Sequence, residues 1–199
     1  MTDQLALSIW LPEALGNWRT RYFEKMLSIF PFSQREQPQS TLTIQGVSVT
    51  EPPLLEHPMN GPVQLADVME ATRDYQGDDI AYRLETWWDL WRYNGEEWEI
   101  GPAHATLCAF GPKFDNGGSL SVFEQEDLRI DFGVDTAFLP NASLAGSTRL
   151  IHSNIKSLLH LVHQIEEALP LQRRVLETES GENFAEKLTQ TLGGENLTQ

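Results

Sequence analysis

The sequence predicts an α+β fold, in which antiparallel strands form one sheet and the helices pack mainly on one of its faces. Two long runs of strand-forming residues, 80–93 and 96–110, flank Asn94-Gly95 and predict a long hairpin. The periodicity of apolar residues predicts further strands and helices on both sides of it. The expected order is strand, helix, strand, helix, meander, helix, helix. We expect a single domain over 1–199; the alternative is a division into a β-α-β unit, 1–62, and the remainder, 63–199.

The first two elements follow from apolar spacing and from prolines. The aliphatic residues Leu5, Leu7, Ile9 and Leu11 alternate with Ala6, Ser8 and Trp10, which predicts a strand with one strongly apolar face that Pro12 ends. A helix is expected from an N-cap at Asn17 to Pro31, with Arg19 among the polar residues that face away from the core. The apolar stripe of this helix consists of Trp18, Tyr22, Phe23, Met26, Leu27 and Phe30.

The next segment contains a strand, an irregular region and a short helix. Residues 41–50 predict a strand, and the change of phase at Gly46 indicates a β-bulge. Pro52, Pro53 and Pro58 predict irregular structure over 51–62. Apolar residues at helical spacing predict an amphipathic helix over 63–75.

The Asn94-Gly95 dipeptide sets the expected pairing of the hairpin, because a two-residue type I′ turn fixes the register. Pro102 has no N–H to donate, so a bulge at Gly101-Pro102 is the alternative, which would move His104 to the apolar face. The apolar pattern favours the continuous register. The pairs that it predicts are Glu85 with His104, Trp87 with Pro102 and Trp91 with Trp98.

The last strands and helices follow from the same patterns. Asn116-Gly117 predicts a turn into a strand at 119–123, and strict alternation predicts a strand over 127–135. Apolar residues that step by four and three predict a long helix over 151–169. Ser180 is expected to cap a final short helix.

The predicted register gathers charged and aromatic residues on the sheet face that points away from the apolar side chains. A carboxylate beside an imidazole, here Glu85 and His104, can serve as a general acid–base pair. Arginines hold anionic groups, and tryptophans stack on planar ligands. An ordinary solvated sheet surface is the alternative interpretation. The candidate binding residues are Arg83, Glu85, Trp87, Asp89, Trp91, Trp98, His104, Arg129 and Asp131.

Composition excludes several classes of function. The 199 residues carry a net charge of −15, and residues 51–100 alone carry 12 acids and 3 bases. Nucleic acids and anionic membranes need a basic surface, so neither is expected as a partner. The start of the chain has no basic region followed by an apolar run, and no segment has the length of a membrane helix. We therefore expect a cytoplasmic protein.

The sequence predicts no metal, no cofactor and no catalytic residue. His160 and His163 have the spacing of helical metal ligands, with Glu167 one turn further, but they lie opposite the apolar stripe and indicate a solvated helix face. Cys108, the single cysteine, has the pattern of a small buried thiol. None of the common phosphate-binding or hydrolase motifs occurs.

These patterns lead to one functional hypothesis and two alternatives. The hypothesis is a non-enzymatic binding protein that uses an acidic, aromatic-bearing sheet face, centred on the hairpin 78–99, to contact a partner protein with a basic surface. The first alternative is a small-molecule-binding protein or enzyme with the Glu85–His104 pair and the tryptophans in a sheet-face cleft. The second is a structural subunit whose apolar surface is buried in a homo-oligomer.

Overall fold

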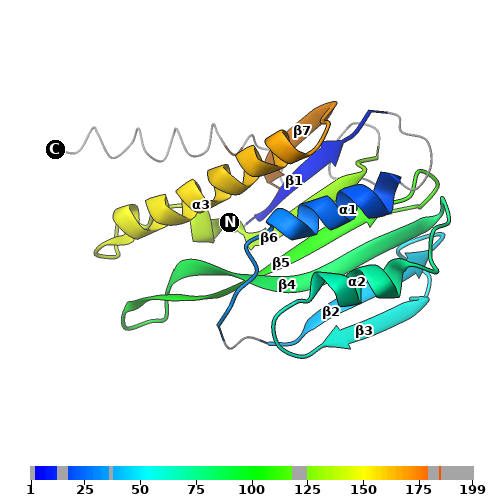
Figure 1. Ribbon diagram of the computed structural model, residues 1–199. Coiled ribbons are helices and arrows are strands. Elements are labelled where there is room, and N and C mark those ends of the chain that lie inside the picture. The colour runs from blue at the N-terminus through cyan, green and yellow to red at the C-terminus, as the bar shows by residue number, and fades with distance from the viewer. Residues whose placement is uncertain (1–2, 13–17, 36–37, 118–124, 179–183, 185–199) are drawn as a thin grey trace.

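The computed structural model describes residues 3–12, 18–35, 38–117, 125–178 and 184. Its strands form one seven-stranded antiparallel sheet in the order β3-β2-β4-β5-β6-β1-β7. The described α-helices lie on one side of this sheet (Figure 1). The predicted α+β class and one-sided helix packing are therefore confirmed. The elements are β1 (Gln4–Trp10), α1 (Trp18–Ile29), β2 (Ser40–Gly46), β3 (Leu55–Met59), α2 (Leu65–Thr72), β4 (Ile80–Tyr93), β5 (Trp98–Phe110), β6 (Leu128–Val134), the 3-10 helix η1 (Asp135–Phe138), α3 (Ser147–Ala168) and β7 (Arg173–Thr178).

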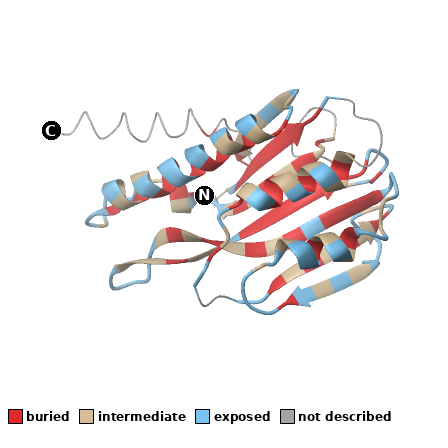
Figure 2. Ribbon diagram, in the orientation of Figure 1, coloured by how far each residue is buried: buried red, intermediate tan, exposed pale blue. Residues whose placement is uncertain are grey.

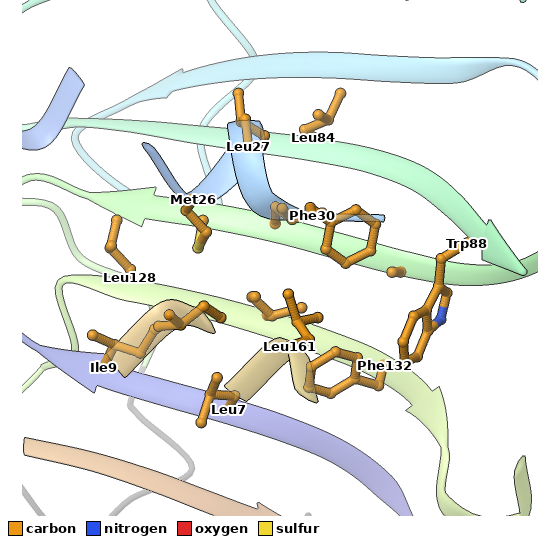
Figure 3. Close-up of a cluster of buried hydrophobic side chains, with 14 of the residues drawn as sticks. Leu7, Ile9, Met26, Leu27, Phe30, Leu84, Trp88, Leu128, Phe132 and Leu161 are labelled. Carbon is orange, nitrogen blue, oxygen red and sulfur yellow. The ribbon is translucent and has the colours of Figure 1, made fainter. Parts of the chain in front are cut away.

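The core lies between the sheet and the helices. All residues of β1 after Gln4 are buried, and so are the residues of α1 and α3 that face the sheet, while the outer sides of the helices are exposed (Figure 2). Trp88 of β4 is the centre of an aromatic cluster and packs beside Phe30 and Phe132 (Figure 3). Its ring centroid lies 5.4 Å from that of Phe132 and 6.0 Å from those of Phe30 and Phe138. Burying each such side chain stabilises the fold by roughly 1.5–3 kcal/mol, which favours a single arrangement of helices over the sheet.

The hairpin β4–β5 forms where it was predicted, but its loop is longer. Four residues, Asn94–Glu97, connect the strands, since the Asn94 side-chain oxygen accepts hydrogen bonds from the backbone N–H groups of Glu96 and Glu97. Each β4 residue therefore pairs two positions further along β5 than expected, and Glu85 lies opposite Thr106 rather than His104. A shift by two leaves the predicted faces unchanged along the part of the hairpin that pairs with β2 and β6. The register runs through Pro102 without a bulge.

The segment after β2 differs from the prediction. Gly46 ends the strand instead of forming a bulge, because Val47 adopts φ +68° and donates its N–H to Asp79. The region predicted as irregular contains β3, with Pro58 in the outermost strand at this edge, where its missing N–H breaks no ladder. The predicted helix forms as α2.

The remaining differences concern a buried arginine, an additional strand and segments that the structure does not describe in full. Arg19 is buried rather than solvated: its guanidinium lies 4.9 Å from the ring centre of Tyr82 and donates to the Gly77 carbonyl. Residues 173–178, which had no predicted strand, form β7. The predicted cap at Asn17 and the strand 119–123 lie outside the described residues. Of the helix predicted after Ser180, Phe184 is described; it is helical and buried, with its ring centroid 6.2 Å from that of Phe138.

The edge of β4 that faces away from β5 has three successive hydrogen-bonding partners along its length. β2 covers this edge as far as Glu85, and the segment after α1 follows, with the Ser33 N–H donating to the Trp87 carbonyl at 2.8 Å. Beyond that point Asn154 of α3 replaces a strand. Its side chain accepts from the Trp91 N–H and donates to the Trp91 carbonyl, both at 2.8 Å, and it also donates to Ala137.

The Asn154→Ala substitution is expected to lower the free energy of unfolding by about 2–4 kcal/mol, because it leaves three backbone groups without their partner. Urea denaturation measures the change. The neighbouring Ser153→Ala, on the exposed side of α3, is the control and is expected to change stability by less than about 0.5 kcal/mol. Equal effects of the two substitutions would contradict the role of Asn154.

Candidate binding face of the sheet

The sheet face opposite α1–α3, here called the polar face, carries most of the predicted binding residues. Strand alternation places them there, since their neighbours in sequence point into the core. The register aligns them in rows across the strands. One row contains Arg83, Cys108, Arg129 and Ser8; the next contains Glu85, Thr106, Asp131, Ala6 and Glu177; and the third contains Trp87 and His104.

The first two rows form ion pairs along the strands. Arg83 lies 2.8 Å from Glu85 on β4, and Arg129 lies 2.7 Å from Asp131 on β6. The β4 pair is about half exposed, with side-chain exposures of 50% and 41%, whereas only 15% of the Arg129 side chain is exposed. Exposed pairs contribute little to stability. The β4 pair is therefore available to a partner, while the β6 pair belongs to the structure.

The β6 side of the polar face contains more acids than the arginine can neutralise. Glu126, whose side chain is fully buried, lies 3.4 Å from the same guanidinium as Asp131. Burial raises the pKa of Asp131, while Arg129 lowers it by a smaller amount. Burial also raises the pKa of Glu177 in the same row. This part of the face holds negative charge in a poorly solvated environment.

Cys108 lies between the two arginines of its row, in a buried and apolar position. Its side chain is buried with Ala81, Phe110 and Phe114 in a small apolar cluster at the end of the polar face. Burial raises the pKa of the Cys108 thiol, so the neutral form predominates at physiological pH. The apolar side chains around Cys108 are consistent with its interpretation as a small buried thiol.

The aromatic row brings together Trp87 and His104. Their rings are 5.1 Å apart in an edge-to-face arrangement. The Trp87 indole nitrogen is buried and has no hydrogen-bond partner among the described residues. The predicted Glu85–His104 pair is wrong in register, because Glu85 lies opposite Thr106 and forms its ion pair with Arg83. The geometry therefore favours an aromatic and ionic surface over an acid–base pair.

Three other predicted residues lie further along the hairpin. Asp89 accepts a hydrogen bond from the Ser33 hydroxyl at 2.7 Å and lies 3.7 Å from Arg35. The predicted Trp91–Trp98 pair is replaced by Tyr93 and Trp98, whose rings are 5.6 Å apart. Trp98 donates to the Ala145 carbonyl at 2.9 Å, beside α3, so it is separated from the polar face.

The twist of the hairpin explains why Trp98 does not lie on the polar face. β2 pairs with β4 only up to Glu85, and β6 pairs with β5 only from Thr106, so the end of the hairpin extends beyond both as a two-stranded ribbon (Figure 1). Such ribbons twist more strongly than wide sheets. The alternation of the strand therefore no longer indicates which layer a side chain faces.

The sequence did not indicate the exposed apolar residues that follow β2. Val47 and Val49 are 58% and 42% exposed, and Leu54, which is 52% exposed, lies over Gly46 and Ile80 on the helix side of the sheet. The Gln45 amide, on the polar face of β2, donates to the carbonyl of Val49 and so holds this loop against the strand end. The spacing of Val47 and Val49 predicts that the strand continues to residue 50, so a loop was not expected at this position.

No metal site is present in the part of the chain that the structure describes, where no three His, Cys, Asp or Glu side chains converge. His160 and His163 are exposed on α3, and His163 lies 3.4 Å from Glu167. Among the described helices, none has the length and apolarity needed to cross a membrane.

Comparison of the chain with protein-family models, with curated proteins and with solved structures gives no match.

The Asp127→Asn substitution tests the electrostatics beside this face. Asp127 accepts the Leu11 N–H at 2.7 Å, and burial raises its pKa. A raised pKa means that the folded state binds the proton more tightly, so the ionised carboxylate destabilises the fold above that pKa. The amide keeps an acceptor for Leu11 without the charge. We expect the variant to be more stable than the wild type at pH 7, with the difference vanishing as the pH falls to about 4. Urea denaturation over a pH series measures this, and a constant difference at all pH values would contradict it.

The Val47→Asn substitution tests the backbone strain at the exposed loop. A β-branched residue at positive φ is strained, whereas asparagine tolerates this conformation. We expect the free energy of unfolding to rise by about 1 kcal/mol. Val49→Asn is the matched control, since Val49 is also exposed but has no positive φ, and it should give no gain.

Proposed function

We propose that this chain is a binding protein that contacts a partner protein through its polar face. The observation that carries the proposal is the alignment of ionic and aromatic side chains in rows across the sheet, on the side away from the described helices. Arg83 and Glu85 remain about half exposed there, beside Trp87 and His104. Aromatic residues and arginine are the residue types enriched in protein interfaces.

The charge of the chain favours a partner with a basic surface. The net charge is −15, and many of the acids are exposed on the edge strand β3, on α2 at the helix side of the sheet and in the loops beside them, so they act on the approach of a partner rather than on its contact with the polar face. The exposed acids of this region are Glu51, Glu56, Asp67, Glu70, Asp74, Asp78, Asp79 and Asp115. A surface of one sign accelerates the approach of a partner of the opposite sign. The exposed Val47 and Val49 add apolar contact area next to the polar face.

The sheet-face enzyme is the weaker interpretation. It required a direct contact between Glu85 and His104, and the register separates them. Glu85 is already paired with Arg83, and His104 packs against Trp87. A broad surface with its charges paired is better suited to another protein than to a small substrate.

Site-specific photo-crosslinking in the cell of origin tests the proposal. A photoreactive residue at position 85 is expected to crosslink one partner with a basic surface, and the same residue at Ser153 on α3 is not. The purified partner is then expected to bind the wild-type chain with an association rate that falls as salt is raised.

The double substitution Arg83→Glu with Glu85→Arg is the matched variant. It keeps an ion pair on β4 and the net charge but reverses the positions of the two charges, so the fold is preserved and complementarity is lost. We expect the affinity for the purified partner to fall at least about tenfold. Unchanged affinity, or equal crosslinking from position 153, would overturn the proposal.

A further inference from the structure

We propose that a pocket at the end of the hairpin binds a small, uncharged molecule that contains a planar ring. The pocket has a volume of about 600 Å³, which is in the range of small-molecule sites. It lies between the last residues of β4, the segment η1 and the start of α3, and it does not include the arginines or acids of the polar face. The proposal is independent of the protein-binding function.

The walls of this pocket are mostly apolar. Leu90 and Ala103 come from the hairpin, Leu139 follows η1, and Ile151 comes from α3. The lining also includes the aromatic residues Trp91, Tyr93 and Trp98. A ring can stack on these groups, so the walls favour an aromatic ligand over an aliphatic chain.

Hydrogen bonds hold the walls in place without a ligand. Asn154 joins Trp91 of the hairpin to Ala137 of η1. The Trp98 indole joins the hairpin to the loop before α3 through the Ala145 carbonyl. The buried Ser147 hydroxyl accepts the Asn141 N–H at 2.8 Å and fixes the other end of that loop. A preformed pocket of this kind binds without the entropic cost of ordering its walls.

The mouth of the pocket exposes large apolar side chains. Tyr93 is 39% exposed and Val134 is 43% exposed, and both line the pocket. Covering this surface with a ligand removes apolar area from water. The exposed area is therefore a driving force for binding an apolar molecule.

The charges at the pocket favour an uncharged ligand. Arg92 is the charged residue among the described residues that line it, and its guanidinium lies 2.9 Å from Glu99. An anion would have to compete with Glu99 for this arginine. No acid lines the described walls, although the chain has 29 acids, so a cation would find no counter-charge. The hydroxyl groups of Thr136 and Tyr93 are suited to one polar group on the ligand.

Three probes with the same ring and different charges test the inference: 2-naphthylmethanol, 2-naphthoate and 2-naphthylmethylammonium. Isothermal titration calorimetry on the full chain measures each dissociation constant. We expect the alcohol to bind at least about tenfold more tightly than either charged probe. No binding of the alcohol at about 1 mM, or equal binding of all three probes, would overturn the inference.

Two substitutions locate the binding. Ala142→Trp fills the pocket from its exposed rim and is expected to weaken the binding of 2-naphthylmethanol at least about tenfold. Ala66→Trp, at an alanine of α2 that is also exposed, is the control and should leave the affinity unchanged. Val134→Thr keeps the shape of the wall and is expected to weaken the binding of the alcohol a few-fold. This smaller substitution tests the pocket even if the Ala142→Trp variant does not fold. Wild-type affinity in both pocket variants would overturn the assignment. The Arg83→Glu, Glu85→Arg variant should keep the affinity, which separates this pocket from the polar face.

Discussion

Burial of one face of the β4–β5 hairpin beneath the helices determines the direction of the side chains along its first half. Trp88, Leu84 and Leu107 occupy that side with almost no exposure, because any register of the other parity would place Arg83 and Glu85 in the core. The polar face is the necessary counterpart of this burial. Each apolar residue that packs against a helix places its polar neighbour on the opposite side.

The polar face is not uniformly solvated: its β4 part is exposed to solvent, whereas its β6 part is largely buried. On β4 the ion pair is exposed and contributes little to stability, which leaves it free to change partners. On β6 the pair of Arg129 with Asp131 lies beside the buried Glu126, where desolvation opposes ionisation. A buried network of this kind contributes more to a unique arrangement than to net stability. The exposed half therefore carries the proposed recognition, and the buried half fixes the strands beneath it.

The sequence was sufficient to predict the faces of the strands but not their exact partners. Alternation on β4 depends on burial, which is a property of the whole strand, so Arg83 and Glu85 were placed correctly despite the wrong register. The register depended on one loop, where the Asn94 side chain closes a four-residue turn instead of the two-residue turn that Asn-Gly favours. β7 and the buried Arg19 were missed because both depend on distant partners, β1 and Tyr82. Such contacts leave no periodic signal in the local sequence.

The same reasoning explains why the pocket could not be predicted while the polar face could. Beyond the edges of β2 and β6 the hairpin is a two-stranded ribbon, and its twist moves Trp98 from the predicted face to the loop before α3. A ribbon of this length exposes backbone groups on its edge, and Asn154 satisfies those of Trp91 from a helix more than sixty residues away in sequence. Asn154 and the Trp98 indole together hold the twisted ribbon against η1, α3 and the loop before α3. The space that remains between them is the pocket, so its existence depends on a tertiary contact and not on the pattern of either strand.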